Sequence, residues 1–456
     1  MCGIVGIYNL KGNPVDVLLL QKMTDVLEHR GPDDKGVFTD KNIGLGHRRL
    51  SIIDISNAGH QPMANKDGTL QIVFNGEIYN FQKLRETLKN SGHYFKSKTD
   101  TEVALHGYEK WGADCLKKFD GMFAFAIFDK KNGQLFLARD RLGEKPLYYF
   151  LDQDKFVFAS EIKAILEDKN IQKNISNQGI INYFTFGHSI APDTIYKGIK
   201  KLLPGHYLII KDGKAEINEY WDSFVKGEET DRGEKYYKQK TREIFEEAVK
   251  EELISDVPLG VFLSGGIDSS SVVAIMAKNG IFPLKTFSVG FDLAGSEFNE
   301  LDDAKIISKH FKTEHYDIFC RPEDFKEHLS KLALYADNLL ADVSLLPVYM
   351  VSRLASDYVK VVLSGDGGDE LFAGYPTYLA DKIAVYYRLF PYFFKRKVIP
   401  YLIKKLPLSY KKMDFEFAAK RFTQYSALPP EEAHYSCRLI FSESEKRSLY
   451  SEECLR

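Results

Sequence analysis

The chain has 456 residues and a formal net charge of −2, with 44% hydrophobic and 28% charged residues. This length is enough for two or three domains with full hydrophobic cores, so folding needs no disulfide scaffold. The near-neutral charge argues against a nucleic-acid-binding protein, and no apolar run approaches the roughly 20 residues of a membrane span, which excludes stable membrane insertion. The five cysteines lack metal-site spacing and follow no secretory signal, which favours the reducing cytoplasm and small-molecule ligands.

The first half of the chain contains short apolar strands, turns and three helical patterns. Strands are predicted at 35–40, 42–54, 69–80, 121–140 and 143–160. Within 121–140 the pair Asn132-Gly133 favours a hairpin turn between two alternating apolar runs. Helical patterns occupy 14–29, 80–92 and 100–112. We therefore expect an α+β domain built on antiparallel sheet.

The pattern changes after a polar, charge-rich segment that is the best candidate for a linker. We place domain boundaries at 1–220 and 237–456, with the linker at 221–236. Beyond the linker, predicted strands at 260–264, 285–291, 314–319 and 359–365 alternate with helices at 239–255, 269–279 and 301–311. Alternation of apolar strands with amphipathic helices predicts an α/β domain with a parallel sheet covered on both faces.

The stretch "FLSGGIDSSSVVA" places a small-residue loop between an apolar strand and a helix. The strand ends at Leu263, and the loop runs from Ser264 through Gly265, Gly266 and Asp268 to Ser269. Glycines allow close approach of the backbone, and N–H groups at a helix N-terminus with serine hydroxyls favour an anion. The lysine of a Walker A loop is missing. The stretch resembles the PP-loop of ATP pyrophosphatases, and the alternative is an ordinary turn at a strand end.

A second strand-to-loop junction, "VKVVLSGDGGDELFAGY", carries acidic residues. In a parallel sheet, loops at the carboxyl ends of neighbouring strands line one crevice, so this loop can face the first. Asp268 and Asp369 could then share a Mg²⁺ ion, which prefers carboxylate and phosphate oxygens. Taken alone, the acidic loop could also be a calcium turn or a plain surface loop.

The segment Tyr386–Leu408 mixes aromatic and basic residues. Pro391, Pro400 and Pro407 would break a long helix. We expect short helices packed in a core with solvated lysines, the alternative being a basic amphipathic surface that rests on anionic lipid.

Cys2 follows the initiator Met and precedes an apolar, β-branched run. If Met1 is removed, this residue carries both a thiol and an α-amine whose pKa lies near 8, so nucleophile and base share one residue. The alternative is a small buried hydrophobe that happens to lie second.

Six further stretches follow Cys2 in order: "RGPDD" at 30–34, "GHRRLSIID" at 46–54, "GHQPM" at 59–63, "FNGEIYN" at 74–80, "SKTDTEV" at 97–103 and "RDRLGEKPLYY" at 139–149. Together they resemble the class II glutamine amidotransferase domain of asparagine synthetases. This domain is an N-terminal-nucleophile (Ntn) hydrolase, an αββα sandwich. The second domain resembles the synthetase domain of the same family, so the resemblance covers nearly the whole chain.

The resemblance implies roles for residues of the first domain. Cys2 is expected to attack the carboxamide of glutamine, with the Asn75 amide and the Gly76 N–H as oxyanion hole. Arg49 would pair with the α-carboxylate and Asp100 with the α-ammonium. The remaining glutamine-binding positions are Leu50, Ser51, Ile52, Ile53 and Glu77. In the family, ammonia released here reaches the second site through an internal tunnel.

At the second site the resemblance implies ATP-dependent activation of a carboxylate, aspartate being favoured, with release of pyrophosphate and then AMP. Leu263 and Val289 would hold the adenosine, and the loop Ser264–Ser269 the pyrophosphate. Ser364 and Gly365 would contact the AMP side, and Asp366 would assist the acyl-adenylate chemistry. ATP is thus expected as substrate and Mg²⁺ as cofactor.

Two departures from the family leave alternatives open. Asn338 and Leu339 replace the usual Glu and Pro of an acceptor loop, and the chain stops at Arg456 before a "KxDRxSM" segment. We therefore expect an incomplete synthetase domain, with a homodimer or a separate partner as ways to complete it. The rivals to aspartate amidation are amidation of another carboxylate, such as a sugar uronate, and a glutaminase with a defective synthetase domain.

Overall fold

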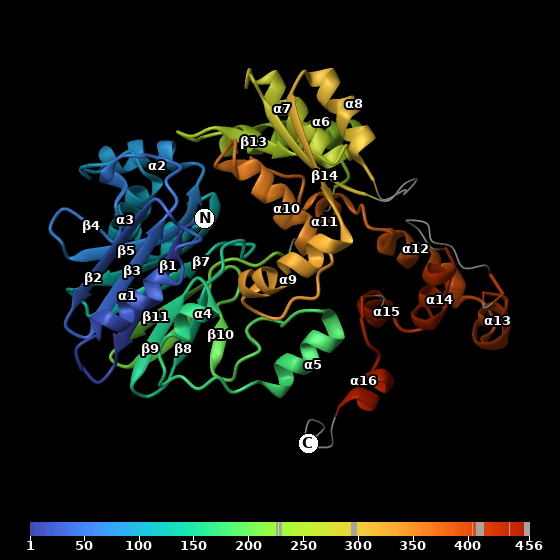
Figure 1. Ribbon diagram of the computed structural model, residues 1–456, viewed down its shortest axis with the longest axis horizontal. Helices are drawn as coiled ribbons and strands as arrows, with labels where there is room; N and C mark the ends of the chain where they lie inside the picture. Colours follow the sequence, from blue (N-terminus) through green and yellow to red (C-terminus); the bar gives the residue numbers. More distant parts are fainter. Residues whose placement is uncertain are drawn as a thin grey trace. The chain divides into compact units, whose positions relative to one another are not determined.

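The computed structural model describes residues 1–224, 227, 230–292, 299–403, 405–406, 415–436 and 438–450 (Figure 1). The chain forms two compact units. Unit 1 comprises Met1–Ile181, Ser189–Val257 and Ala336–Leu340, and unit 2 comprises Asn182–His188, Pro258–Tyr335 and Ala341–Arg456. Among the described residues, no helix has the length and apolar character needed to cross a membrane.

Unit 1 is built on two six-stranded sheets in which the paired strands run antiparallel. The first sheet has the order β10 (Ile199–Lys201), β8 (Tyr148–Leu151), β9 (Lys155–Ala159), β1 (Gly3–Asn9), β3 (Ile43–Arg49), β2 (Asp34–Asp40). The second has the order β12 (Lys214–Glu219), β11 (His206–Lys211), β7 (Gln134–Arg139), β6 (Gly121–Asp129), β5 (Leu70–Ile78), β4 (Met63–Ala64). The predicted hairpin is present, because Asp129 pairs with Gln134 around Gly133, which has φ +58°.

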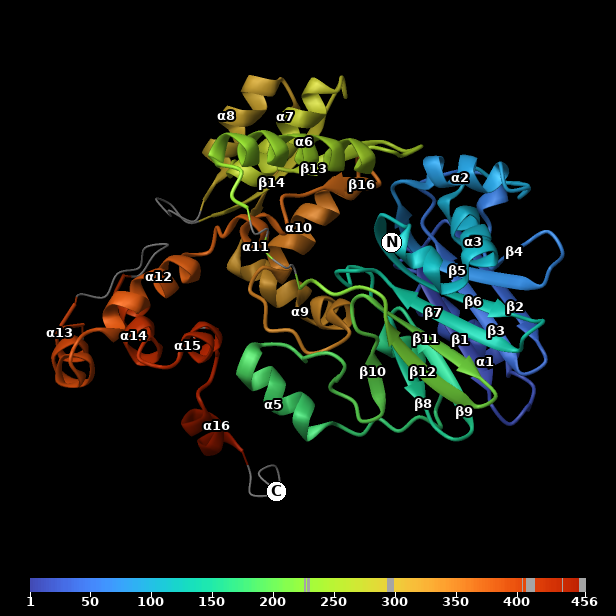
Figure 2. The same ribbon diagram turned by 180° about the vertical axis from the view of Figure 1, so that it is seen from behind.

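Helices cover the outer face of each sheet of unit 1, as Figures 1 and 2 show. α1 (Val17–Asp25) and α4 (Ile162–Ile165) contribute to a core against the first sheet. α2 (Phe81–Lys89) and α3 (Asp100–Trp111) contribute to a core against the second sheet. A third core lies between the sheets. The αββα sandwich predicted for the first domain is confirmed.

Strand alternation decides which side chains point between the two sheets. Ile4, Leu45 and Val73 belong to the core between the sheets. Because successive side chains of a strand point to opposite faces, residues an even number of positions away point the same way. The residues at such positions are Cys2, Arg49, Asn75 and Glu77. Residues at the ends of three different strands are thus directed to one region.

Unit 2 contains a parallel sheet, confirming the α/β prediction. Its strand order is β15 (Glu314–Cys320), β14 (Lys285–Phe291), β13 (Leu259–Phe262), β16 (Val361–Leu363), and each pair is parallel. α7 (Ile267–Lys278) and α8 (Leu301–Phe311) lie on one face and α10 (Leu345–Ser356) on the other (Figures 1 and 2). Phe287 on β14 is fully buried and packs against Val351 and Ala355 of α10.

The remaining helices are α5 (Asn177–Phe186), α6 (Glu234–Glu252), α9 (Pro322–Ala336), α11 (Gly368–Phe372), α12 (Pro376–Arg388), α13 (Ile399–Ile403), α14 (Phe415–Tyr425), α15 (Pro430–Ser436) and α16 (Glu443–Leu449). The expectation for the aromatic and basic segment is only half right. In its described residues, 386–403 and 405–406, the helices are short, but Tyr386, Leu389 and Tyr392 are 71%, 79% and 74% exposed instead of packed in a core; residues 404, 407 and 408 lie outside the described residues. Proline spacing limits helix length and carries no information about what the apolar faces contact.

Candidate active sites

Cys2 lies at the start of β1, where backbone groups of the segment after β3 surround its sulfur. The Leu50 N–H donates to Cys2 Sγ at 3.4 Å, and the thiol faces the Leu50 carbonyl oxygen at 3.8 Å. Arg30 Nε donates to the Cys2 carbonyl oxygen at 2.9 Å, while its Nη1 pairs with Glu161 at 2.8 Å. These contacts fix the backbone of Cys2 and therefore the position of its thiol.

Burial shifts the pKa values of the Cys2 thiol and of the amino terminus next to it. It raises the pKa of the Cys2 thiol, so the thiol is protonated at neutral pH and needs a base. Burial, with the charges of Arg30 and Lys145, lowers the pKa of the amino terminus on Met1 to about 6, although the Met1 residue is half exposed. The amino group of Met1 is therefore largely neutral at pH 7.

Asn75, on β5, is completely buried, yet neither Nδ2 nor Oδ1 has a hydrogen-bond partner within the described part of the chain. The preceding residue is held on both sides, because the Phe74 N–H donates to Gln61 Oε1 at 2.7 Å and His47 Nε2 lies 3.1 Å from the Phe74 carbonyl oxygen. A buried amide without a hydrogen-bond partner lowers the stability of the folded state. It therefore indicates a site where a ligand supplies the missing hydrogen bonds.

Gly76 follows Asn75 and brings a bare backbone N–H to the same place. A Cβ at this position would lie 2.2 Å from the Met122 carbonyl oxygen on β6, so only glycine fits between the two strands. The Asn75 amide and the Gly76 backbone are adjacent donors of the kind that an oxyanion hole requires.

Arg49 lies at the end of β3 and is 5% exposed. Its guanidinium donates to the carbonyl oxygens of Ser56 at 3.1 Å, Ile53 at 3.2 Å and Asp54 at 2.5 Å. Gly59 makes room for it, because a Cβ there would lie 1.9 Å from Nη2. These partners are neutral, and no carboxylate in the described part of the chain forms an ion pair with Arg49, as a site for an anionic ligand group requires.

The loop Leu50–Ile53 is tied to neighbouring segments at several points. The Ser51 N–H donates to Asp33 Oδ2 at 2.8 Å, and the Ile52 carbonyl oxygen accepts from the Asp256 N–H at 3.0 Å. With Leu50 on the sulfur of Cys2 and Ile53 on Arg49, each residue of this predicted stretch has a defined place.

Asp100 and Glu77 bring two acids close to the same region. Asp100, at the start of α3, is buried and accepts from the N–H groups of Ile78 and Thr101, both at 2.9 Å. Burial raises its pKa to about 6. Burial, together with the charge of Asp100, raises the pKa of Glu77 to about 7. A cationic ligand group would favour the ionised form of Asp100.

Sequence reasoning gave no role to several residues that support this site. Arg30 contacts the backbone of Cys2, and the buried Lys145 Nζ lies 3.6 Å from Met1 Sδ. His47 and Gln61 hold the residue before Asn75. All four occur within the quoted family motifs, so the motifs contained the signal, but their contacts join segments far apart in the sequence.

Unit 2 contains a cavity of about 530 Å³ at the carboxyl ends of β13, β14 and β16. Its lining includes most of the predicted nucleotide-binding residues: Leu263, Ser264, Gly266, Asp268, Ser269, Val289, Ser364, Gly365 and Asp366. Gly265 and Asp369 are not part of the lining. The strand ends of a parallel sheet therefore bring the two predicted loops to one cavity.

The loop from Ser264 to Ser269 is held by its own hydroxyls. Ser264 Oγ and Ser269 Oγ lie 3.0 Å apart, and the Gly266 N–H donates to Ser264 Oγ at 3.2 Å. Gly265 has φ +83°, and a Cβ on it would lie 2.6 Å from Asp303 Cβ of α8. Glycine is therefore needed for both the backbone conformation and the contact with α8.

The acidic loop approaches Asp268 through glycines. A Cβ on Gly368 would lie 2.7 Å and 2.8 Å from the two carboxylate oxygens of Asp268, so the bare backbone gives this carboxylate its space. Asp369 follows directly, and its Oδ1 lies against Gly374. Ser364 Oγ donates to Asp366 Oδ2 at 3.0 Å. Carboxylate and hydroxyl oxygens at this cavity suit a hard divalent cation and a phosphate ligand.

Comparisons with known proteins identify the family of each of the two domains. Residues 1–221 match the family model of the glutamine amidotransferase domain, and residues 240–450 match that of asparagine synthase. The chain is therefore a glutamine-dependent amidotransferase joined to a synthetase domain.

Individual relatives show to which family of amidotransferases the chain belongs. A putative glutamine-hydrolysing asparagine synthetase 2 of Methanocaldococcus jannaschii is 42% identical over 83% of this chain and 76% of that protein. Asparagine synthetases 1 and 3 of Bacillus subtilis are 37% and 39% identical, over 98% and 83% of this chain and 69% and 64% of their own lengths. The chain belongs to the family of glutamine-hydrolysing asparagine synthetases, which are carbon–nitrogen ligases.

Proposed function

We propose that the protein hydrolyses glutamine at Cys2 and uses the ammonia to amidate a carboxylate that ATP has activated, with aspartate as the favoured acceptor and asparagine as product. The observation that carries the first half is the fully buried Asn75 amide without a partner in the described residues. A hydrolase that stabilises an oxyanion needs a donor that is kept free for it. The second half is supported by the cavity at the strand ends of unit 2.

In the first reaction, the amino group left on Cys2 after removal of Met1 accepts the thiol proton as the sulfur attacks the carboxamide carbon. Arg49 holds the α-carboxylate and Asp100 the α-ammonium, while Asn75 and the Gly76 N–H stabilise the oxyanion. The C–N bond breaks as the leaving nitrogen takes the proton, giving ammonia and a γ-glutamyl thioester. Water then cleaves the thioester to glutamate and the free thiol. A catalytic thiol that stays free is compatible with the reducing cytoplasm, which we propose as the location.

In the second reaction, ATP occupies the cavity of unit 2. Leu263 and Val289 flank the adenosine, Ser264–Ser269 contact the pyrophosphate, and Ser364 with Gly365 lie on the AMP side. The acceptor carboxylate attacks the α-phosphate and releases pyrophosphate, and ammonia then displaces AMP. Asp268 and Asp369 would hold Mg²⁺, which neutralises phosphate charge when bound. Asp366 assists the acyl-adenylate steps. We assign these reactions to domains 1–220 and 237–456, joined by the linker 221–236.

Purified protein supplied with glutamine, ATP, Mg²⁺ and aspartate tests the proposal. Glutamate, AMP, pyrophosphate and asparagine should appear in equal amounts. Cys2→Ala should abolish synthesis from glutamine but not from added ammonia, since the second site is untouched. AMP formed only with another acid, such as a uronate, would exclude aspartate as acceptor. If glutamate is released but none of the acids supports AMP formation, the protein is a glutaminase without synthetase activity.

A further inference from the structure

The motif "SKTDTEV" contains a buried acid, Glu102, that the proposed mechanism does not use. It lies in the first turn of α3 and is 5% exposed. Thr99 caps the helix by accepting the Glu102 N–H at 3.2 Å. In a capping box the acid would in turn accept from the N–H of the cap residue. Here its carboxylate reaches further back along the chain instead.

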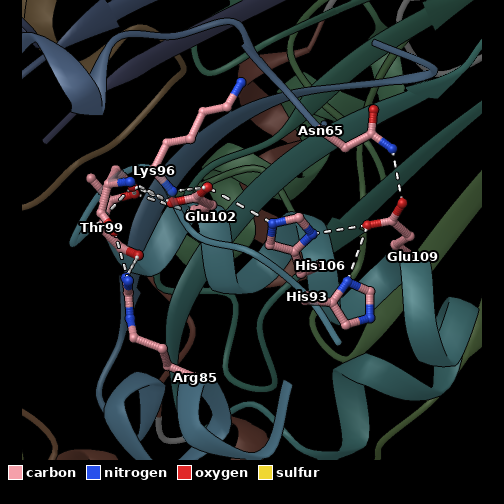
Figure 3. Close-up of polar contacts among 9 residues, drawn as sticks. Asn65, Arg85, His93, Lys96, Thr99, Glu102, His106 and Glu109 are labelled. Carbon is pink, nitrogen blue, oxygen red and sulfur yellow. Dashed lines mark hydrogen bonds and ion pairs between the residues drawn. The ribbon is translucent and has the colours of Figure 1, made fainter. Parts of the chain in front are cut away.

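The Glu102 carboxylate binds the loop that precedes α3 with both oxygens. Oε1 accepts from the Lys96 N–H at 2.8 Å, and Oε2 accepts from the Ser97 N–H and the Ser97 hydroxyl, each at 2.7 Å (Figure 3). Charge-assisted hydrogen bonds of this length are the strong ones. The carboxylate therefore fixes the backbone that leads into Thr99 and Asp100.

Arg85 of α2 holds the carbonyl groups of the same loop. Its two terminal nitrogens donate to the Ser97 carbonyl oxygen at 2.6 Å and the Thr99 carbonyl oxygen at 2.7 Å. The guanidinium also lies over the Phe95 ring, 4.5 Å from its centroid. Glu102 thus binds the N–H groups of Lys96 and Ser97, and Arg85 binds the carbonyl groups of Ser97 and Thr99.

His106, one turn further along α3, holds Glu102 in place. Its Nε2 lies 3.8 Å from Glu102 Oε1, and its Nδ1 lies 2.8 Å from Glu109 Oε2 (Figure 3). Asn65 donates to the other oxygen of Glu109 at 2.9 Å, and His93 Nδ1 lies 3.4 Å from Oε2. The ring thus lies between two carboxylates, which, against the opposing effect of its burial, raise the pKa of His106.

We propose that Glu102, Arg85 and His106 are positioning residues for glutamine hydrolysis: they hold the loop 96–99 so that the Asp100 carboxylate meets the α-ammonium of glutamine. This inference rests on the proposed role of Asp100. The other contacts of Asp100 are the N–H groups of Ile78 and Thr101. The position of the Asp100 carboxylate therefore depends on the backbone that precedes it, where Glu102 binds the N–H groups of Lys96 and Ser97 and Arg85 binds the carbonyl groups of Ser97 and Thr99.

The first variant is Glu102→Gln, which keeps the shape of the side chain. Either orientation of the amide sets an NH₂ group against an N–H of the loop, because both carboxylate oxygens accept from N–H groups. A displacement of the order of 1 Å in a substrate-binding group costs about a hundredfold in rate. We expect kcat/KM for glutamine to fall about 10- to 100-fold. The fall should come from a higher KM, while kcat stays nearly unchanged.

A second positioning variant keeps the experiment decisive if Glu102→Gln folds poorly, and a third variant serves as control. Arg85→Met keeps the packing on Phe95 and removes both bonds to the loop, so KM should rise in the same way. Glu86→Gln, an exposed change on α2 that breaks only a pair with Lys89, is the matched control and should leave KM unchanged.

The substrate analogue 4-carbamoylbutanoate, which lacks the α-amine, separates positioning from general damage. The Glu102→Gln and Arg85→Met variants should hydrolyse it at the wild-type rate, and either change should add less than about twofold to the KM effect of Asp100→Asn. Exhaustive dialysis against a chelator should leave KM unchanged, because His106 Nδ1 contacts Glu109 Oε2 directly at 2.8 Å.

Two kinds of failure are distinguishable. If Asp100→Asn raises KM but Glu102→Gln and Arg85→Met leave it unchanged or act additively with Asp100→Asn, the positioning role is wrong and the proposed function survives. If Asp100→Asn itself leaves KM for glutamine unchanged, the assignment of Asp100 is wrong and the inference falls with it. A KM that depends on a metal ion would overturn the role proposed for His106.

Discussion

Replacing Asn75 by leucine should make the protein more stable and much less active. The side chain is completely buried and both its polar atoms lack partners in the described residues. A buried polar group without a partner costs about 1–3 kcal/mol, and leucine has a similar shape without polar atoms. We expect a gain of at least about 1 kcal/mol in the free energy of unfolding, which raises Tm by about 2–4 °C in a domain of this size. Loss of one oxyanion donor should lower kcat by about 10²–10³-fold.

Asn65 provides a matched control in the same unit. It is also buried, but its amide donates to Thr69 Oγ1 at 3.2 Å and to Glu109 at 2.9 Å, and its Oδ1 accepts from the Leu70 N–H at 3.0 Å. Asn65→Leu leaves these groups unpaired and should lower stability by about 1–3 kcal/mol. Thermal melting of both variants and glutamate release from glutamine give the two readouts. If Asn75→Leu lowers Tm as much as Asn65→Leu, the amide of Asn75 has a partner in the free protein and the reasoning is refuted.

Three other changes test the remaining parts of the site. Because burial raises the pKa of Glu77 to about 7, the folded state keeps a proton that the unfolded chain loses above about pH 4.5. The free energy of unfolding therefore falls as pH rises from 4.5 to 7. The Tm of Glu77→Gln should exceed that of the wild type by an amount that grows between pH 5 and pH 7.5. A Tm difference that stays constant with pH would contradict the raised pKa of Glu77. Gly265→Ala places a Cβ 2.6 Å from Asp303 Cβ and should reduce ATP-dependent pyrophosphate release. Gly280→Ala is the control, because Gly280 also has a positive φ but has open space around it. An equal loss of pyrophosphate release in both variants would argue for backbone strain alone. Asp268→Asn should raise the Mg²⁺ concentration needed for half-maximal pyrophosphate release at saturating ATP, and an unchanged requirement would remove Asp268 as a ligand.

Periodicity and motif spacing predicted the architecture because both depend on local sequence. The alternation of Ile4, Leu45 and Val73 marks the buried face of three strands, and alternating strands and helices mark the parallel sheet of unit 2. The same alternation directs Cys2 and Asn75 to one side. The family motifs then supply the chemistry of these positions.

Contacts between distant segments could not be predicted in this way. Arg30 reaches the backbone of Cys2, and Gln61 reaches Phe74, through side-chain directions that no local pattern specifies. The exposure of Tyr386 on α12 was missed for a related reason: an amphipathic pattern shows that a face is apolar, but the partner of that face is decided by tertiary packing.

Asn75 and Glu102 show two opposite ways in which a buried polar group is used. Glu102 accepts three hydrogen bonds and faces an imidazole, so it is satisfied before any substrate arrives and contributes a fixed backbone. Asn75 has no described partner and lies beside a glycine that admits no side chain, so its amide is satisfied only by a ligand. Natural sequences depart from local consistency chiefly where function requires it. The degree of hydrogen-bond satisfaction therefore separates the residue that binds from the residue that positions, which residue type and motif membership do not.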